Sequence, residues 1–108
     1  MNSSNRMLLI SATVCSLNLL IVSAAGAVTQ GPLTIQAVGT QGGTGYVAFT
    51  TPLTETCTWN NVYFNLTTDA GKATLSVLLT AHASGRPITR IDYSKDNQGT
   101  CWIDLVQL

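Results

Sequence analysis

Charged residues are scarce in this sequence. Lysine, arginine, aspartate and glutamate together make up 9% of the 108 residues, and the five basic residues balance the five acidic ones. So little charge is not typical of a disordered acidic or basic tail. A nucleic-acid binder would need a basic excess, so we expect no nucleic-acid partner. The length supports one short domain and excludes a repeat array, a two-domain enzyme and a long coiled coil.

Residues for catalysis are also few. His82 is the single histidine, and the motifs of serine hydrolases, zinc proteases and calcium loops are absent. His82 could act as a general base if Ser84, Asp92 or Asp104 lay beside it. We favour the interpretation that His82 is a polar residue near the end of a helix, where a cation also interacts favourably with the helix dipole. We therefore expect no enzyme activity, no catalytic residue, no cofactor and no metal.

Hydrophobic residues concentrate at the start of the chain. Polar residues 1–6 precede an apolar stretch over 7–22, and Ala25-Gly26-Ala27 follows. These are the three parts of a secretory signal peptide, with cleavage after the last alanine. The alternative is a membrane anchor, but the stretch is shorter than the roughly 20 residues of a spanning helix. We predict a signal peptide over 1–27, a single secreted or periplasmic domain over 28–108, and no stable membrane insertion after cleavage.

Three cysteines are present, and Cys15 falls within the predicted signal peptide. Export would place Cys57 and Cys101 in an oxidising compartment, where paired cysteines persist as disulfides. A bridge between them would close a loop of about 45 residues, for which the loss of chain entropy in the unfolded state is worth about 4 kcal/mol. The alternative is a zinc site with His82. Such a site needs four ligands, and neither cysteine has a second one two to four residues away, so we predict the disulfide.

Extended segments dominate the sequence after the signal peptide. Alternating apolar residues and β-branched or aromatic residues predict five strands, within residues 33–38, 46–50, 57–64, 88–93 and 100–108. Residues 39–45 are rich in glycine and predict a turn between the first two strands. The last strand has apolar residues on both faces, so we expect it inside the sheet.

One helix is predicted over residues 69–84. Thr68 and Asp69 are both good N-caps, and Gly85 can adopt the left-handed conformation that ends a helix. Four residues have the spacing of one helix face: Leu75, Leu78, Leu79 and His82. Three strands before the helix and two after it predict the α+β class, with a small, mainly antiparallel sheet of about five strands, one helix and one disulfide.

The second half of the chain resembles a known pattern. A leucine-rich helix (GKATLSVLLTAHASG) is followed by Arg86-Pro87-Ile88, a strand that ends in tyrosine (ITRIDY), a polar turn and a cysteine-containing strand (TCWIDLVQL). This order, over residues 57–108, is similar to small exported proteins of Gram-negative bacteria. It also resembles the B subunits of bacterial A–B toxins, including the subtilase cytotoxin type. The resemblance implies an oligonucleotide/oligosaccharide-binding-like (OB-like) fold, a homopentamer and binding of cell-surface glycans.

The aromatic side chains are the candidates for contact with a glycan. Tryptophan and tyrosine offer an apolar ring with a polar edge, which suits stacking on a sugar. Five residues could stack in this way: Tyr46, Trp59, Tyr63, Tyr93 and Trp102. The candidate ligand-binding residues are Trp59, Tyr63, Tyr93 and Trp102, together with the basic residues Arg86 and Arg90. Trp59 and Trp102 lie within two residues of Cys57 and Cys101, so packing against the disulfide is the simpler alternative for both.

Two functions from different classes fit these observations. The first is a small exported binding module, similar to a toxin B subunit, whose partner is a glycan or a protein surface. The second is a periplasmic or envelope protein with a structural or inhibitory role and no catalysis. A glycan signal together with the mass of an oligomer would favour the first function.

Overall fold

A six-stranded sheet and one helix form the framework of residues 27–108, the part of the chain that this computed structural model describes. The strands are β1 (Val28–Gln30), β2 (Ile35–Gln41), β3 (Thr44–Phe49), β4 (Asn61–Asn65), β5 (Arg90–Lys95) and β6 (Cys101–Gln107). Helix α2 (Asp69–Ser84) connects β4 to β5, and a short 3-10 turn (Thr58–Asn60) precedes β4. The predicted signal peptide lies outside the described residues, apart from Ala27. Within residues 27–108, no helix has the length and hydrophobicity needed to cross a membrane.

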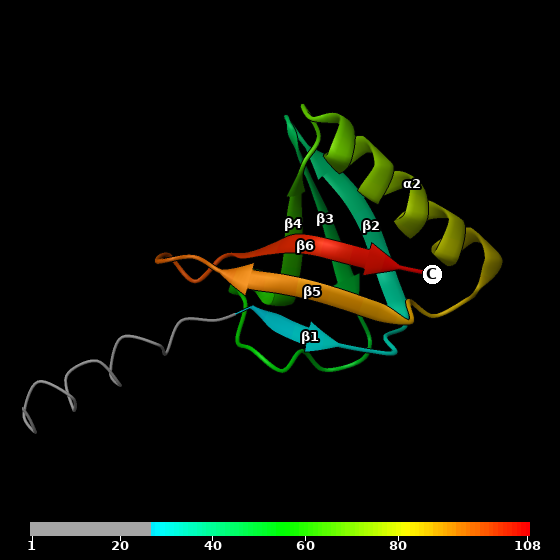
Figure 1. The fold of residues 1–108 in the computed structure, drawn as a ribbon, viewed down its shortest axis with the longest axis horizontal. Coiled ribbons are helices and arrows are strands. Elements are labelled where there is room, and N and C mark those ends of the chain that lie inside the picture. The colour runs from blue at the N-terminus through cyan, green and yellow to red at the C-terminus, as the bar shows by residue number, and fades with distance from the viewer. Residues whose placement is uncertain (1–26) are drawn as a thin grey trace, which may run out of the picture.

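The sheet has the strand order β1-β5-β6-β4-β3-β2. Neighbouring strands are antiparallel, except that β4 and β6 run parallel. Figure 1 shows that β2, β3 and β4 run across the direction of β1, β5 and β6, so the sheet is bent into two halves. A bridge between Leu33 and Ile88 joins the segments that lead into β2 and β5. The predicted α+β class and mainly antiparallel sheet are confirmed, and β6 lies inside the sheet as predicted.

The strand boundaries differ from the prediction at several places. The strand predicted from residue 57 begins only at Asn61, because a 3-10 turn occupies Thr58–Asn60, and the strand predicted over 88–93 covers Arg90–Lys95. β1 adds a sixth strand, which pairs with residues 91–93 of β5. The predicted turn over residues 39–45 is too long, because β2 continues to Gln41 and β3 begins at Thr44. Large rings lie where a Cβ at Gly39 or Gly45 would be, so these glycines serve packing inside the strands and do not form the turn.

The core lies between the two halves of the sheet and α2. It contains the buried side chains Leu33, Ile35, Val47, Phe49, Val62, Phe64, Leu78, Ala81, Ile88, Ile91 and Tyr93, together with Cys57 and Cys101. The two cysteines form the predicted disulfide, with their Cα atoms 5.5 Å apart. The bridge joins the loop before β4 to the first residue of β6, so it ties two distant parts of the chain next to the core.

The bounds of the helix match the prediction. The side-chain oxygen of Thr68 accepts a hydrogen bond from the backbone nitrogen of Gly71 at 3.0 Å, which satisfies a free N–H in the first turn. Gly85 ends the helix with a φ of 68°, in the left-handed region that glycine adopts without a steric penalty. The capping residues therefore specify both ends of α2.

The buried face of the helix differs from the predicted one. Gly71, Leu78 and Ala81 are buried, whereas Leu79 is 48% exposed and His82 is exposed. A side chain at Gly71 would overlap the carbonyl oxygen of Asn65 at the end of β4, so the glycine lets the helix backbone approach the sheet closely. This contact rotates α2 away from the face that the leucine spacing alone indicates.

Candidate functional site

Three aromatic side chains form a row on the sheet face opposite the core. Tyr46 of β3 is paired with Tyr63 of β4, and Tyr63 is paired with Trp102 of β6. Their ring centroids lie 6.3 Å and 6.0 Å apart along this row. The residues on either side of them in β3 and β4 point into the core, because successive side chains of a strand alternate between its faces. We call these three residues, together with Trp59, the aromatic face.

Trp59 is the most exposed large hydrophobic residue of the aromatic face. Its side chain is 83% exposed, compared with 37% for Trp102. Trp59 and Asn60 both have positive φ values, 59° and 56°. Bulky residues rarely adopt this left-handed conformation, and backbone strain of this kind costs about 1–3 kcal/mol at each residue. Because Trp59 is exposed, its side chain does not pack against the disulfide. The interpretation that it does so is wrong for this residue.

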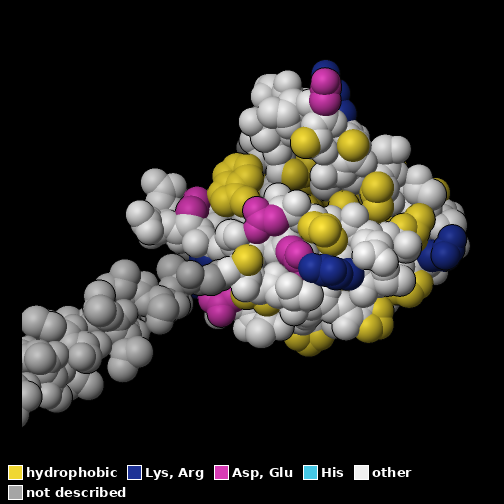
Figure 2. Space-filling view, in the orientation of Figure 1, with side chains coloured by type: hydrophobic (Ala, Val, Ile, Leu, Met, Phe, Trp, Pro, Cys, Tyr) yellow, Lys and Arg dark blue, Asp and Glu magenta, His cyan; other side chains and the backbone are white. Residues whose placement is uncertain are grey.

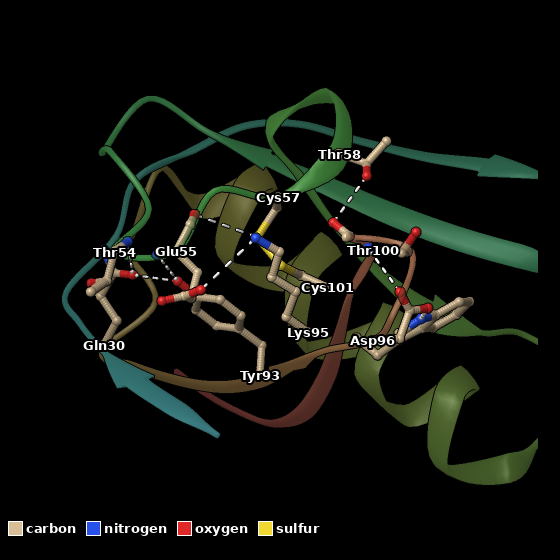
Figure 3. The surroundings of a disulfide bond; sticks show 12 residues. Gln30, Thr54, Glu55, Cys57, Thr58, Tyr93, Lys95, Asp96, Thr100 and Cys101 are labelled. Atoms are coloured by element: carbon tan, nitrogen blue, oxygen red, sulfur yellow. Dashed lines mark hydrogen bonds and ion pairs between the residues drawn. A yellow bond between two sulfur atoms is a disulfide. The ribbon is translucent and has the colours of Figure 1, made fainter. Parts of the chain in front are cut away.

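The chain on either side of Trp59 is held in place. Cys57 is fixed by the disulfide, and the backbone nitrogen of Asn60 donates to the carbonyl oxygen of Cys57 at 2.9 Å. The backbone nitrogen and the hydroxyl of Thr58 both donate to the carbonyl oxygen of Gly99, at 3.0 Å and 2.9 Å. Figure 3 shows how the disulfide and the hydroxyl of Thr58 tie this loop to the end of the β5–β6 turn. These bonds hold the backbone of the loop that carries Trp59 and offset its strain.

The four aromatic side chains line a shallow depression of about 450 Å³. Small-molecule sites have volumes of about 300–1,000 Å³, so a small ligand fits this space. The remaining lining residues are polar and uncharged: Gln41, Thr44, Thr58 and Thr100, with Asn61 in an adjoining depression. Aromatic rings beside amides and hydroxyls can combine stacking with hydrogen bonding.

Asp96 holds one end of the aromatic face. Its carboxylate accepts hydrogen bonds from the indole Nε1 of Trp102 at 3.0 Å and from the backbone nitrogens of Thr100 and Gln98, each at 2.9 Å. The bond from Trp102, followed by the one from Thr100, lowers the pKa of Asp96 below its ordinary value. The ionised carboxylate therefore fixes the orientation of the Trp102 ring.

Tyr46 is positioned at the other end by a glycine. A Cβ atom at Gly39 of β2 would overlap the ring and hydroxyl of Tyr46, so this ring lies directly over the β2 backbone. The rings at the two ends of the row are thus placed by contacts within the fold: Trp102 by a hydrogen bond and Tyr46 by packing.

Tyr93, a predicted ligand contact, lies in the core and not on the aromatic face. Its side chain is fully buried. Its hydroxyl donates to Gln30 Oε1 at 3.1 Å and accepts from the backbone nitrogen of Glu55 at 3.2 Å. Figure 3 shows Tyr93 beside the disulfide, between β1 and the loop that leads to Cys57. Its position indicates a structural role.

The two arginine candidates lie away from the depression. Arg90 makes two hydrogen bonds to Asp92 within β5, at 3.0 Å and 2.9 Å. This pairing raises the pKa of Arg90 and lowers the pKa of Asp92. Arg86 is exposed just after α2. In Figure 2 the charged side chains form scattered small groups on the viewed face and no continuous basic surface. Of the six candidates, the structure brings together Trp59, Tyr63 and Trp102.

Tyr46, one of the aromatic residues expected to be able to stack on a sugar, lies in this depression beside Trp59. Sequence reasoning missed the polar residues of the site as candidates, among them Gln41 and Asn61. The alternation in the segments 46–50 and 62–64 can place Tyr46 and Tyr63 on one face of neighbouring strands. Gln41 and Asn61 carry no such signal, because they lie at strand ends.

In the described part of the chain, the side chains that could assist His82 in catalysis are engaged elsewhere. It is exposed on α2, whereas Asp92 contacts Arg90 and the carboxylate of Asp104 accepts a hydrogen bond from Ser94. Among residues 27–108, no group of three or more histidine, cysteine, aspartate and glutamate side chains is arranged to hold a metal ion. The aromatic face is therefore the best-formed candidate site in this part of the chain.

Comparisons of the chain with family models, with curated proteins and with solved structures found no match. The resemblance to toxin B subunits stays a prediction that rests on the sequence pattern of residues 57–108.

Proposed function

We propose that this protein is an exported binding module with an OB-like fold that recognises glycans through its aromatic face. The observation that carries the proposal is the exposure of Trp59, which a strained backbone keeps at the surface beside three further aromatic rings. Strained residues cluster at functional sites, where the surrounding structure compensates their cost. An exposed tryptophan contributes little to the stability of the fold, so we attribute its position to contact with a ligand.

The order and direction of the strands support the OB-like part of the proposal. An OB-fold is a five-stranded, partly open Greek-key barrel. Strands β2, β3 and β4 form a meander, α2 follows β4, and β5 and β6 form a hairpin whose second strand runs parallel to β4. The bridge between Leu33 and Ile88 brings the start of β2 to the start of β5, as closure of such a barrel requires. In this proposal β1 is an addition to the five barrel strands.

The disulfide and the signal-peptide pattern support export to the periplasm or the exterior. Disulfides persist in these compartments and are rare in the reducing cytosol. The resemblance adds assembly into a homopentamer, which would present several aromatic faces at once and raise the avidity for a cell surface. The mass of the purified protein in solution tests this assembly directly.

A glycan array followed by a tryptophan-fluorescence titration tests the function. We expect the wild type to bind a subset of glycans and Trp59→Ala to lose at least tenfold in affinity. Trp59→Ala should keep its fold, because the side chain is exposed. Leu79→Ala is the matched control, since it removes another exposed large side chain, on α2, away from the depression. It should bind like the wild type.

The second function, a structural or inhibitory protein of the envelope, gives a different result. No glycan would bind on the array, and the affinity for an envelope protein would fall in Trp59→Ala if the same face were used. Absence of any glycan binding at millimolar concentration would contradict the proposal.

A further inference from the structure

We infer that the aromatic face selects uncharged saccharides and discriminates against sialylated or sulfated ones. This inference rests on the proposed function and names its ligand class. It follows from the charges on and around the aromatic face and not from the aromatic residues themselves.

The depression presents polar groups but no charge. Its polar side chains are amides and hydroxyls, at Gln41, Thr44, Thr58 and Thr100, besides the tyrosine hydroxyls and the indole nitrogens. Amides and hydroxyls can both donate and accept hydrogen bonds, as the hydroxyls of a neutral sugar do. No lysine or arginine lines the depression, so an acidic ligand would find no cation there.

Two charged residues follow one another at the end of β5, Lys95 and Asp96. The Nζ atom of Lys95 lies 4.0 Å from Oε1 of Glu55, so a carboxylate already faces this cation. Figure 3 shows both residues beside the disulfide. Asp96, which holds Trp102, is a carboxylate and is ionised at neutral pH. The formal charge attached directly to the aromatic face is therefore negative.

An acidic sugar would lose affinity for two reasons. Its carboxylate or sulfate would give up water without an opposite charge to replace it. It would also approach the carboxylate of Asp96, and like charges repel. A neutral sugar incurs neither cost and keeps the same stacking on the rings. The difference should therefore appear as a ratio of affinities between glycans that are otherwise identical.

The shape of the site suits a short saccharide. The planes of the Tyr46 and Tyr63 rings are inclined at 50° to each other, and so are those of the Tyr63 and Trp102 rings. Rings at such angles do not form one flat platform, so a glycan that lies over the row contacts ring faces of different orientation. With Trp59 projecting beside the row, a sugar can contact rings on more than one side.

The test uses the full chain expressed with its own N-terminal segment and purified after export. It is applied to a glycan array that carries matched sets: lactose and N-acetyllactosamine as neutral glycans, and their 3′-sialylated and 3′-sulfated forms as acidic ones. Affinities are then measured by tryptophan fluorescence at low salt. We expect each neutral member that binds to do so at least tenfold more strongly than its acidic counterpart, with binding lost in Trp59→Ala.

A second variant tests the electrostatic explanation. Gln41→Lys places a cation at the edge of the depression, and Gln41→Ala is its control for loss of the amide. We expect Gln41→Lys to reduce the neutral-to-acidic ratio at least threefold, and added salt to weaken this effect. Gln41→Ala should leave the ratio unchanged.

The outcomes separate this inference from the proposed function. If acidic glycans bind as well as neutral ones and Trp59→Ala abolishes that binding, the selectivity is refuted and the glycan-binding function stands. An unchanged ratio in Gln41→Lys would refute the electrostatic origin of the selectivity. If no glycan on the array binds, both the function and the selectivity are refuted.

Discussion

The indole Nε1 of Trp102 donates a hydrogen bond to the carboxylate of Asp96 at 3.0 Å, which connects the β5–β6 turn to the aromatic face. The same carboxylate also organises the turn, because it accepts hydrogen bonds from the backbone nitrogens of Gln98 and Thr100. One ionised side chain thus sets both the turn that follows β5 and the orientation of a ring in the candidate site. Its ionisation couples the stability of the fold to pH.

The lowered pKa of Asp96 predicts a loss of stability in acid. Hydrogen bonds, above all that from Trp102, place the folded pKa below the unfolded value of about 3.9. A carboxyl group with a depressed pKa contributes stability that is present above the unfolded pKa and is lost as the pH falls through the folded pKa. The free energy of unfolding should therefore fall between pH 7 and pH 3, and fall less in Asp96→Asn. Urea unfolding at both pH values measures this difference.

Asn97→Ala provides the control for the Asp96 prediction, since it changes the same exposed turn without removing the carboxylate. Its loss of stability between pH 7 and pH 3 should equal that of the wild type. Asp92, whose pKa is also lowered, is present in all three proteins and contributes equally to each. Identical losses in the wild type and in Asp96→Asn would contradict the assignment.

The disulfide predicts a large effect of reduction on stability. Cys57 and Cys101 are both buried, and their bond closes a loop of about 45 residues. Replacing both with serine should lower the free energy of unfolding by about 4 kcal/mol, from the chain entropy regained by the unfolded state. Urea unfolding with and without a reductant checks this. Reductant should destabilise the wild type and leave the double variant unchanged, and an equal stability of the two proteins without reductant would show that the bridge contributes little.

Local sequence signals predicted those parts of the fold that depend on neighbouring residues. The bounds of α2 follow from Thr68 and Gly85, which act within one turn of each helix end. The strand β1 was missed because it has three residues, too few for a pattern, and it pairs with residues about sixty positions further along the chain. Two residues of the predicted helix face, Leu75 and Leu78, pack against the core. The other two, Leu79 and His82, are exposed, because the packing of α2 depends on contact between Gly71 and the end of β4, which no local pattern contains.

The candidate site was predictable only in part for the same reason. Tyr63 and Tyr93 are both tyrosines in strand-like segments, and the sequence gives no sign that one faces the surface and the other the core. The row of Tyr46, Tyr63 and Trp102 depends on the parallel pairing of β4 with β6, which is a property of the whole topology. The exposure of Trp59 depends on a left-handed backbone that is unusual for tryptophan.

Substitution of Tyr93 should lower the stability of the fold and leave glycan binding unchanged. Its buried hydroxyl bonds to Gln30 and to the backbone nitrogen of Glu55. Tyr93→Phe leaves these partners without that hydroxyl, and a lost bond of this kind costs about 1–3 kcal/mol. Urea unfolding should show this cost, while the affinity for a glycan stays that of the wild type. Tyr63→Phe, on the aromatic face, should show the opposite pattern: a small change in stability and a weaker affinity. A weaker affinity in Tyr93→Phe at unchanged stability would place Tyr93 in the binding site.

Substitution of Gly39 tests how strongly glycan binding by the aromatic face depends on the position of the Tyr46 ring. Alanine ordinarily stabilises a strand by roughly 0.5–1 kcal/mol relative to glycine. At Gly39 its Cβ would overlap the ring of Tyr46, so the ring has to move and the ordinary gain is lost. We expect Gly39→Ala to be no more stable than the wild type and to bind a glycan several-fold more weakly. Thr40→Ala is the control, because Thr40 is an exposed neighbour in β2, and it should bind normally. Urea unfolding and tryptophan-fluorescence titration measure both quantities. A more stable Gly39→Ala with unchanged affinity would show that the position of the Tyr46 ring does not matter for binding.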